Sequence, residues 1–558
     1  MPQKSGSRLL AEYLAESGVT HVFFLPAILL QALAELDDLG VRRIMVHGEK
    51  AAAYMADGYA RASGRPGICL SQYIGASNLA AALRDPWLAN SPVIAMTGGP
   101  TTSSRYRHAY QEIEDFSQFD PVTKFNARVD AVDRLPDLLR QAFREATSGC
   151  PGPAHLQLRG PHGQVAEELT GVASPFEGRF VSVPAFRPAP ERESVRAAAK
   201  AIAEAKRPII VAGGGVMHSG AGEQVVALAE ALGIPVATSM NAKEIIVDNH
   251  PLSVGVVGSY SRHCANKAVA GADLVVFIGS HTGGQVTHNW SIPPRGTAVI
   301  QIDIDPVELG RNYPNAVSVM GDAKIASEAL LQEAQKLPQS DRQSWIVEVQ
   351  SYVAAWRAEM ETFLGSSAVP MRPERICRAI SDMLPADGVV VSDTGHSGIW
   401  SSTMIELRHK TQRYVRCAGS MGWGFPGSLG VKCALPDKPV LCWTGDGAFY
   451  YHIGELETAA RYGINVVVVV NNNSALNQEI PLIDDAYRGT QGKHPEDVWR
   501  HRSTDFSKVA ESFGCRGIRV EDPKDLNDAL REAFAENRPV VVDAVSDERA
   551  FAQKAWAP

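Results

Sequence analysis

Five consecutive valines at residues 466–470 constrain the fold of this chain more than any other stretch. A continuous run of β-branched apolar residues is typical of a parallel strand that is buried on both faces, with helices covering the sheet. Upstream, the turn Gly445-Asp446-Gly447 follows a strand that ends at Thr444, and residues 448–461 are expected to form a helix. The pattern therefore predicts an α/β domain with a parallel sheet.

Oxygen-bearing side chains follow two neighbouring strands of this predicted sheet. Asp446 comes after the first strand, and three asparagines at residues 471–473 come after the second. Because ligands bind at the carboxyl edge of open α/β sheets, we expect these groups to lie side by side. Mg²⁺ is usually held by one or two protein oxygens plus substrate phosphates, so the pattern favours a metal-bound diphosphate. A purely structural acidic turn is the alternative that this stretch alone leaves open.

The chain of 558 residues is too long for one hydrophobic core. Helical stretches alternate with short apolar strands in residues 1–170, after which prolines interrupt the pattern. The alternation resumes in residues 190–338 and, after a polar stretch, in residues 365–550, which contain the valine run. We therefore predict three α/β domains with these bounds.

Composition excludes several classes of partner. The net charge is −8 and no basic stripe is present, so we do not expect nucleic-acid binding. Apolar runs are broken before membrane-spanning length and the N-terminus lacks an apolar signal core, so we expect a cytoplasmic protein without a membrane partner. The eight cysteines form no C-x-x-C pair and are expected to be small buried hydrophobes.

Two further stretches carry candidate ligand-binding residues. Glu49 begins a helix of small residues, where a carboxylate is favourably placed at the helix N-terminus and, taken alone, is explained as a cap. Gly213-Gly214-Gly215 follows a strand of the second unit and could admit a phosphate. The full Gly-x-Gly-x-x-Gly spacing is not met, so ordinary tight packing is favoured.

Taken together, His47-Gly48-Glu49 with its small-residue helix and Gly445-Asp446-Gly447 with asparagines 471–473 resemble a known signature. It is that of thiamine diphosphate-dependent enzymes of the acetolactate synthase and pyruvate decarboxylase superfamily, and the organisation is closest to the acetolactate synthase large subunit. The resemblance covers essentially the whole chain. It implies three doubly wound parallel-sheet domains, which are pyrimidine-binding (1–170), central (190–338) and diphosphate-binding (365–550). It also implies a homodimer or homotetramer, because the family builds each site from two subunits.

The resemblance also implies roles for individual residues. Cofactor contacts are implied for Glu49, Gly395, His396, Gly419, Met421, Gly445, Asp446, Gly447 and Asn473. Mg²⁺ would be held by Asp446, Asn473 and the backbone carbonyl of Ala475, with Asn472 as the alternative to Asn473. Glu49 would hydrogen-bond the pyrimidine ring and favour the tautomer that activates the cofactor, which is acid–base work.

The implied reaction is decarboxylation of a small 2-keto acid, followed by transfer of the carbanion to a carbonyl acceptor. The alternative within the class is a non-oxidative decarboxylase or lyase that acts on a 2-keto acid or an acyl-CoA. An alternative of another class is a cofactor-binding homologue without turnover. The presence of Glu49, Asp446 and the asparagines argues against that homologue.

Four residues are expected to line the substrate pocket: Tyr73, Gln111, Leu476 and Glu479. Tyr73 stands where acetolactate synthases usually carry glycine, and Gln111 matches their glutamine that faces the substrate from the partner subunit. Leu476 and Glu479 lie in the region where those synthases carry a tryptophan. Glu479 resembles the catalytic glutamate of pyruvate decarboxylases, with a surface helix residue as the alternative. FAD is left open, because His281 replaces an arginine that is expected to contact the flavin.

Overall fold

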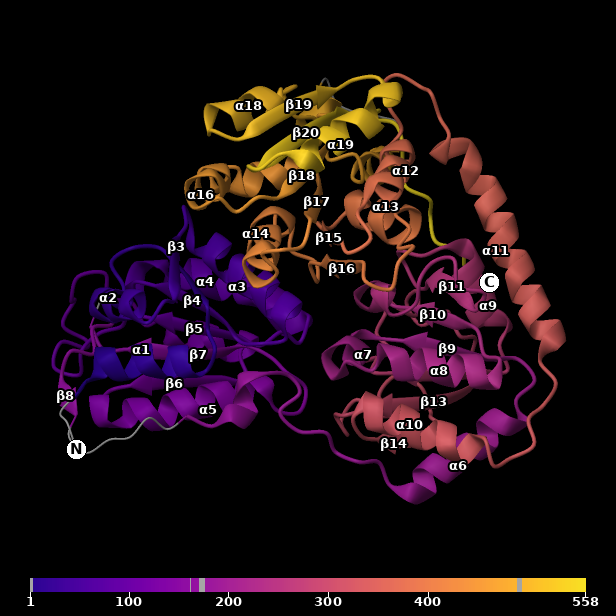
Figure 1. The fold of residues 1–558 in the computed structure, drawn as a ribbon, viewed down its shortest axis with the longest axis horizontal. Coiled ribbons are helices and arrows are strands. Elements are labelled where there is room, and N and C mark those ends of the chain that lie inside the picture. The colour runs from indigo at the N-terminus through magenta and orange to yellow at the C-terminus, as the bar shows by residue number, and fades with distance from the viewer. Residues whose placement is uncertain (1–3, 161, 170–175, 489–493) are drawn as a thin grey trace.

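The structure is a computed structural model that describes residues 4–160, 162–169, 176–488 and 494–558. Three six-stranded sheets of parallel strands form its framework, and helices flank each sheet (Figure 1). The predicted fold class, three doubly wound parallel sheets, is confirmed. The predicted end of the first domain, residue 170, lies outside the described residues.

The first sheet has the strand order β3-β2-β4-β5-β7-β6. Its strands are β2 (His21–Phe24), β3 (Arg42–Met45), β4 (Gly67–Ser71), β5 (Val93–Thr97), β6 (Phe125–Val129) and β7 (Ala154–Leu158). The helices are α1 (Gly6–Glu16), α2 (Leu30–Asp38), α3 (Glu49–Ser63), α4 (Ala76–Leu88) and α5 (Leu135–Thr147), and β1 (Lys4–Ser5) pairs with β8 (Glu168–Leu169) nearby. The strand order reverses between β2 and β4, so the loops after these strands border a binding crevice.

The third sheet repeats this order as β16-β15-β17-β18-β20-β19. Its strands are β15 (Val389–Ser392), β16 (Arg413–Arg416), β17 (Val440–Gly445), β18 (Val467–Asn472), β19 (Arg516–Val520) and β20 (Val540–Val545). The helices are α12 (Pro373–Met383), α13 (His396–Met404), α14 (Gly424–Ala434), α15 (Asp446–Phe449), α16 (Glu455–Tyr462), α17 (Ile480–Ala486), α18 (Phe506–Ser512) and α19 (Leu526–Ala535). Its switch point lies between β15 and β17, so the turn at Asp446 borders the crevice.

The central sheet has a different order, β11-β10-β9-β12-β13-β14. Its strands are β9 (Pro208–Ala212), β10 (Val236–Thr238), β11 (Ser253–Val256), β12 (Leu274–Ile278), β13 (Ala298–Asp303) and β14 (Val317–Met320). The helices are α6 (Arg192–Glu204), α7 (Gly214–Ser219), α8 (Gly222–Leu232), α9 (His263–Gly271) and α10 (Ala323–Ala334). The long helix α11 (Gln343–Leu364) then leads along the outside of the molecule towards the third domain (Figure 1).

Four of the five valines, residues 467–470, lie in β18, Val466 directly precedes the strand, and all five side chains are buried. The helix expected over residues 448–461 is wrong as a single element. The segment divides into α15, a 3₁₀ turn at Tyr450–His452, and α16. Gly454 lies at the break, where glycine weakens a helix, and the side chain of the next residue, Glu455, accepts a hydrogen bond from the His47 amide of the first domain (3.0 Å).

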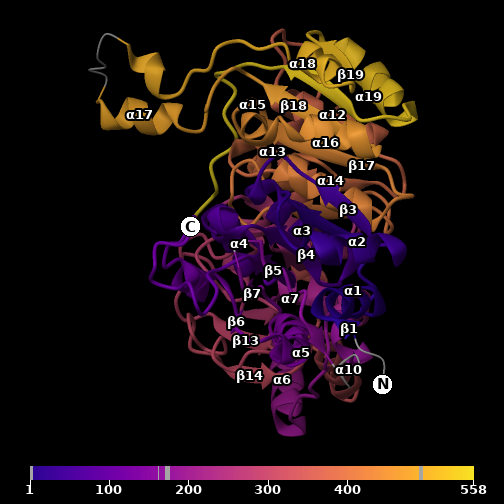
Figure 2. The same cartoon turned by 90° about the vertical axis from the view of Figure 1, so that its left-hand side faces the viewer.

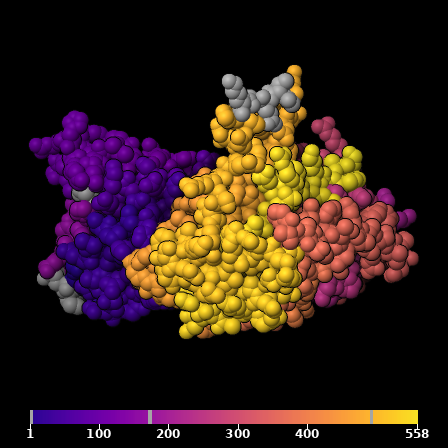
Figure 3. Space-filling model, turned by 90° about the horizontal axis from the view of Figure 1, so that it is seen from above, coloured from indigo at the N-terminus to yellow at the C-terminus, as the bar shows by residue number. Residues whose placement is uncertain are grey.

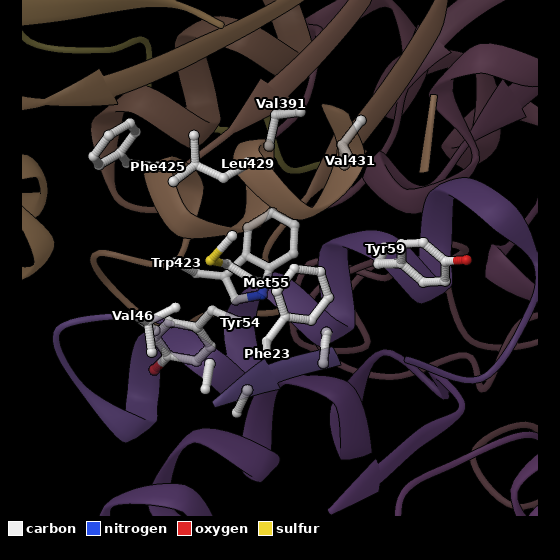
Figure 4. Close-up of a cluster of buried hydrophobic side chains, with 14 of the residues drawn as sticks. Phe23, Val46, Tyr54, Met55, Tyr59, Val391, Trp423, Phe425, Leu429 and Val431 are labelled. Carbon is white, nitrogen blue, oxygen red and sulfur yellow. The ribbon is translucent and has the colours of Figure 1, made fainter. Parts of the chain in front are cut away.

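Helices α3 and α14 join the first and third domains through one continuous buried core (Figure 4). Their backbones approach closely at glycines: a Cβ on Gly58 would lie 2.0 Å from the carbonyl oxygen of Gly427. Tyr54 and Met55 of α3 belong to the same core as Trp423, next to α14. The two domains that carry the predicted cofactor contacts are therefore packed together within one chain.

The helices and the cysteines bear on two expectations from composition. No helix among the described residues is both long and apolar enough to cross a membrane. The eight cysteines are free thiols, and all except Cys150 are buried. They pack as small apolar side chains, in agreement with the prediction.

His155 in β7 makes the stability of the fold dependent on pH. Its ring is fully buried, contacts Thr97 Oγ1 (2.8 Å) and Asn126 Oδ1 (2.7 Å), and stacks on Phe119. Burial lowers the pKa of His155 from 6.5 to about 3. Between these values the unfolded chain binds a proton that the folded chain does not. The free energy of unfolding should therefore fall as the pH drops below 6.5, by up to about 1.4 kcal/mol per pH unit from this residue.

The variant His155→Gln, whose amide does not titrate, isolates this contribution. Urea unfolding at about pH 7 and about pH 5 should show a smaller loss of stability on acidification in the variant than in the parent protein. An equal loss in both proteins would contradict the assignment.

Candidate active site

The turn after β17 carries a buried carboxylate that has a free oxygen. Asp446 is 2% exposed, and its Oδ1 accepts a hydrogen bond from the Gly447 amide (2.7 Å). Its Oδ2 is buried and has no partner among the described residues. Burial raises the pKa of Asp446 to about 7, and the amides of Gly447, Ser474 and Ala475 oppose the rise. A buried oxygen without a partner is costly unless a cation or donor meets it, so Asp446 fits a metal ligand.

The asparagine triplet divides into side chains with different surroundings. Asn472 donates to Asp543 Oδ1 (2.7 Å) and is held inside the sheet. Asn473 follows β18, and its Oδ1 accepts from the Ala475 amide (3.1 Å), while the Oδ1 of Asn471 is buried without a partner among the described residues. Carboxylate, amide and carbonyl oxygens suit Mg²⁺. The described residues contain no cluster of three His, Cys, Asp or Glu side chains that could hold a metal by itself.

Gly395 and His396 lie on the other side of the switch point, after β15. Gly395 has a φ of +68°, a conformation that favours glycine. His396 begins α13, and its Nδ1 lies 2.9 Å from Asn477 Oδ1. Burial lowers the pKa of His396, and the bond to Asn477 opposes the shift. A neutral histidine next to the free amides at a helix N-terminus can accommodate a phosphate group.

Gly419 lies in a loop that is fixed by the first domain. Its amide donates to Asp85 Oδ2 (3.1 Å), and the amides of Ala418 and Ser420 also donate to this carboxylate (2.8 and 2.9 Å). Asp85 is a fully buried residue of α4, and Arg61 of α3 approaches its Oδ1 within 2.7 Å. The predicted carbonyl contact of Gly419 is therefore positioned by a residue more than three hundred positions away in the sequence.

Arg61 lies at the centre of this buried cluster. Its Nε donates to Asp57 Oδ1 (2.8 Å), its Nη1 donates to the carbonyl oxygen of Arg416, and its guanidinium lies over the Trp423 ring (4.7 Å). Trp423 Nε1 in turn donates to Asp57 Oδ2 (2.9 Å). Burial raises the pKa of Asp57, and the nearby positive charge of Arg61 opposes the rise. One cation thus holds two buried carboxylates at the junction of the two domains.

Met421 is enclosed between two such anchors. Asp85 holds the loop on its N-terminal side, and Asp393 holds it on the other side by accepting from the amides of Gly422 (3.1 Å) and Gly424 (2.7 Å). Burial raises the pKa of Asp393 to about 6. Because both flanks of Met421 are fixed by buried carboxylates, its position is set by the protein before any ligand binds.

Glu49 is the first residue of α3 and is 9% exposed. Its Oε2 accepts a hydrogen bond from Asn78 Nδ2 (3.1 Å). Gly75 lets the entrance of α4 approach the carboxylate, because a Cβ there would lie 2.3 Å from Glu49 Oε1. Glu49 is therefore a shielded carboxylate with one fixed partner, which is the environment that acid–base chemistry requires.

The four predicted pocket residues form two pairs. Tyr73 and Gln111 lie together in the first domain, where the Tyr73 hydroxyl contacts Ile113. Leu476 packs on the turn at Gly447, where a Cβ would lie 2.6 Å from its Cδ2. Glu479 is exposed at the start of α17. Figure 2 shows α17 on a segment that projects from the third domain, and Figure 3 shows the orange part of the chain standing out from the surface of that domain.

Several site residues have no individual signal in the sequence. Asp85 and Asn78 lie within a helix, and their partners become apparent only when the chain folds. Asp393 directly follows the strand β15, so its position at the carboxyl edge could have indicated a role. The Nε2 of His501 is buried without a partner among the described residues and lies beside Gly447.

A cavity of about 430 Å³ lies at the switch point of the central sheet. It is lined by the loops after β9, β10, β12 and β13, and its polar lining includes Asn241, His281, Asp303 and Arg416. Beside it, Gly215 packs against the Cα of Gly279, where a Cβ would lie 2.8 Å away. The glycine run thus serves close packing at this position and also borders a space large enough for part of a nucleotide.

Comparison with known proteins agrees with the fold. Family models of thiamine pyrophosphate enzymes match residues 4–119 (N-terminal TPP binding domain), 195–330 (central domain) and 393–544 (C-terminal TPP binding domain). The probable acetolactate synthase large subunit of Methanocaldococcus jannaschii is 32% identical over 97% of this chain and 92% of its own length. The acetolactate synthase large subunit of Haemophilus influenzae is 30% identical over 98% of this chain and 95% of its own length. The large subunit of acetolactate synthase isozyme 3 of Escherichia coli is 28% identical over 98% of this chain and 96% of its own length.

The three sheets and the paired switch points define a thiamine pyrophosphate enzyme. The resemblance inferred from Glu49 and the Asp446 turn is thereby confirmed at the level of the class. Within that class, the chain belongs to the acetolactate synthase large-subunit family, with which it aligns over nearly its whole length.

Proposed function

We propose that this protein is a thiamine diphosphate- and Mg²⁺-dependent carboligase that decarboxylates a 2-keto acid and transfers the resulting fragment to a carbonyl acceptor. The observation that carries the proposal is the buried, unpartnered Oδ2 of Asp446 beside the Asn473 turn. A chain that served only structure would be expected to satisfy this oxygen.

The residues fit the cofactor at both of its ends. Asp446, Asn473 and the Ala475 carbonyl would hold Mg²⁺. Asn473 is favoured over Asn472 as the ligand, because the side chain of Asn472 is already bonded to Asp543. The loop at residues 395–396 would face the diphosphate, and residues 419–421 would face the pyrimidine and the bend of the cofactor. When bound, thiamine diphosphate supplies an electron sink for the electrons left by departing CO₂.

Glu49 would hold and exchange a proton at a ring nitrogen of the cofactor. Its burial and its bond to Asn78 keep the carboxylate oriented and shielded from water, which strengthens a hydrogen bond to a ligand. Gln111 would contact the substrate, since its Oε1 is buried and has no partner among the described residues. Gln111 would position the substrate and Glu49 would exchange the proton, while the cofactor supplies the reactive carbon.

Product analysis with pyruvate distinguishes the carboligase from a decarboxylase. Acetolactate as the main product is expected for the carboligase, whereas acetaldehyde alone would favour protonation by Glu479. Glu479 is exposed in the single chain. A decarboxylase that uses Glu479 as its proton donor therefore requires that a partner subunit cover this residue. The variant Glu479→Gln should leave acetolactate formation within about twofold if the residue is only a surface group.

Asp446→Asn tests the metal site directly. The variant keeps the size of the side chain and removes its charge. We expect Mg²⁺ to bind at least about tenfold more weakly, because losing even an outer-shell partner costs about 10- to 100-fold in metal affinity. Titration of Mg²⁺ in the presence of thiamine diphosphate, followed by calorimetry, measures the change. Asp437→Asn, at an exposed position of the same domain, is the control, and equal Mg²⁺ affinity in both variants would overturn the assignment.

The proposed active form is at least a homodimer. Large apolar side chains are exposed beside the predicted substrate residues, including Tyr106 (76% exposed), Tyr110 (78%) and Leu482 (62%). Large exposed apolar side chains are candidate contacts of a partner subunit, since exposed apolar surface marks interaction sites. Native mass spectrometry should report a dimer or tetramer, and a monomer with full activity would contradict the proposal.

The proposed reaction needs no FAD for its chemistry, because decarboxylation followed by ligation involves no net oxidation. The central cavity, with His281 in its lining, could still hold a nucleotide for structural reasons. Denaturing the purified protein and measuring the released chromophore shows directly whether a flavin is bound.

A further inference from the structure

We propose that Tyr73 is a positioning residue whose hydroxyl clamps the loop that carries Gln111. The proposal deepens the proposed function, since it rests on Gln111 facing the substrate. A tyrosine next to a substrate pocket would ordinarily be taken for a group that contacts the substrate. The structure directs its hydroxyl towards the protein backbone instead.

The clamp has two hydrogen bonds. Tyr73 lies in the 3₁₀ turn Tyr73–Gly75 directly after β4, and its side chain is 2% exposed. Its hydroxyl accepts from the Ile113 amide (3.2 Å) and donates to the Ile113 carbonyl oxygen. The Tyr73 hydroxyl therefore satisfies both backbone polar groups of Ile113. It fixes the backbone two residues after Gln111.

The loop before Ile113 is held in a conformation that needs such support. Tyr106, His108 and Gln111 all have positive φ, at 63°, 55° and 64°. Non-glycine residues in this region persist only where the surroundings enforce the conformation. The Glu112 carboxylate supplies part of that restraint by accepting from the amides of Tyr106 (2.7 Å) and Ala109 (2.8 Å).

Gln111 lies between these two restraints. The Glu112 ring of hydrogen bonds closes the loop on itself, and the Tyr73 clamp attaches it to the end of β4. The Oε1 of Gln111 is buried and has no partner among the described residues, so it is available to a ligand. Fixing the backbone on one side therefore fixes where this amide is presented to the substrate.

The variant Tyr73→Phe removes the hydroxyl and keeps the ring. The control is Tyr59→Phe, which removes another buried tyrosine hydroxyl of the same domain, the one bonded to Thr20 Oγ1 (2.7 Å). Hydrogen exchange of the full-length protein is measured first, because the Ile113 amide loses its acceptor in Tyr73→Phe. We expect exchange in residues 106–113 to be about threefold to tenfold faster in Tyr73→Phe and unchanged in Tyr59→Phe. Unchanged exchange in Tyr73→Phe would overturn the proposal.

Steady-state kinetics with 2-keto acids are measured second. A displaced Gln111 should raise the KM of Tyr73→Phe by about threefold to tenfold and leave kcat within about twofold. A fall in kcat at constant KM would assign the hydroxyl to the chemistry and overturn the positioning role. If the parent protein turns over no 2-keto acid, the proposed function fails while the exchange result still decides whether the clamp exists.

Discussion

Glu49→Gln is expected to lower kcat by about 10²- to 10⁴-fold, the range in which a positioned acid or base contributes. The substituted amide is nearly isosteric and can still accept a hydrogen bond from Asn78 (3.1 Å in the parent). It cannot exchange a proton with a ring nitrogen. The fold and the packing of Gly75 against the side chain should therefore be preserved while turnover is lost.

The control for this experiment is Glu457→Gln. Glu457 pairs with His47, two residues before Glu49, at a partly exposed position (2.7 Å), and surface ion pairs contribute about 0–1 kcal/mol. Its kcat should stay within about twofold of the parent value. Thiamine diphosphate affinity, followed by fluorescence, separates lost catalysis from lost binding. Full turnover in Glu49→Gln would remove Glu49 from the mechanism.

Arg61→Gln should destabilise the protein by about 3–5 kcal/mol, the usual cost of breaking a buried ion pair by removing one partner. The substitution leaves Asp57 and Asp85 buried without the cation that holds them. The loop at residues 418–420, which Asp85 fixes, should loosen, and thiamine diphosphate should be retained less well. Urea unfolding measures the loss of stability.

The pH dependence of the stability loss in Arg61→Gln identifies the cause of that loss. Without Arg61, burial keeps the pKa of Asp57 raised, so protonation relieves the unpaired charge and the defect should shrink on acidification from about pH 7 to about pH 5. Arg65→Gln, at an exposed position two residues after the same helix, should change stability by less than about 0.5 kcal/mol. A defect in Arg61→Gln that does not depend on pH would point to lost packing on Trp423 instead.

The parts of the fold that follow from local pattern are predictable from the sequence. The valines form β18 because a β-branched run suits a doubly covered strand, and Asp446 reaches the sheet edge because it directly follows β17. The division of the expected helix at Gly454 is not predictable, because one cause lies in the first domain at His47. The same holds for Asp85, whose partners at residues 418–420 lie in another domain.

Residue identity alone also does not predict where a side chain points. Tyr73 is predicted as a pocket residue because it stands where the family usually carries glycine, but the direction of its hydroxyl depends on the path of a loop forty residues further along the chain. Glu479 likewise directly precedes α17, and its immediate neighbours in the sequence do not predict that this helix projects from the third domain (Figure 2).

The core shared by α3 and α14 has a consequence for how the protein comes apart. Residues on both sides of the central domain contribute to this one buried cluster, and residues that share one buried core are expected to open as one cooperative unit. We therefore expect the cooperative unit of unfolding to be discontinuous in sequence. It combines the first and third domains, while the segment that connects them along the chain is not part of that core.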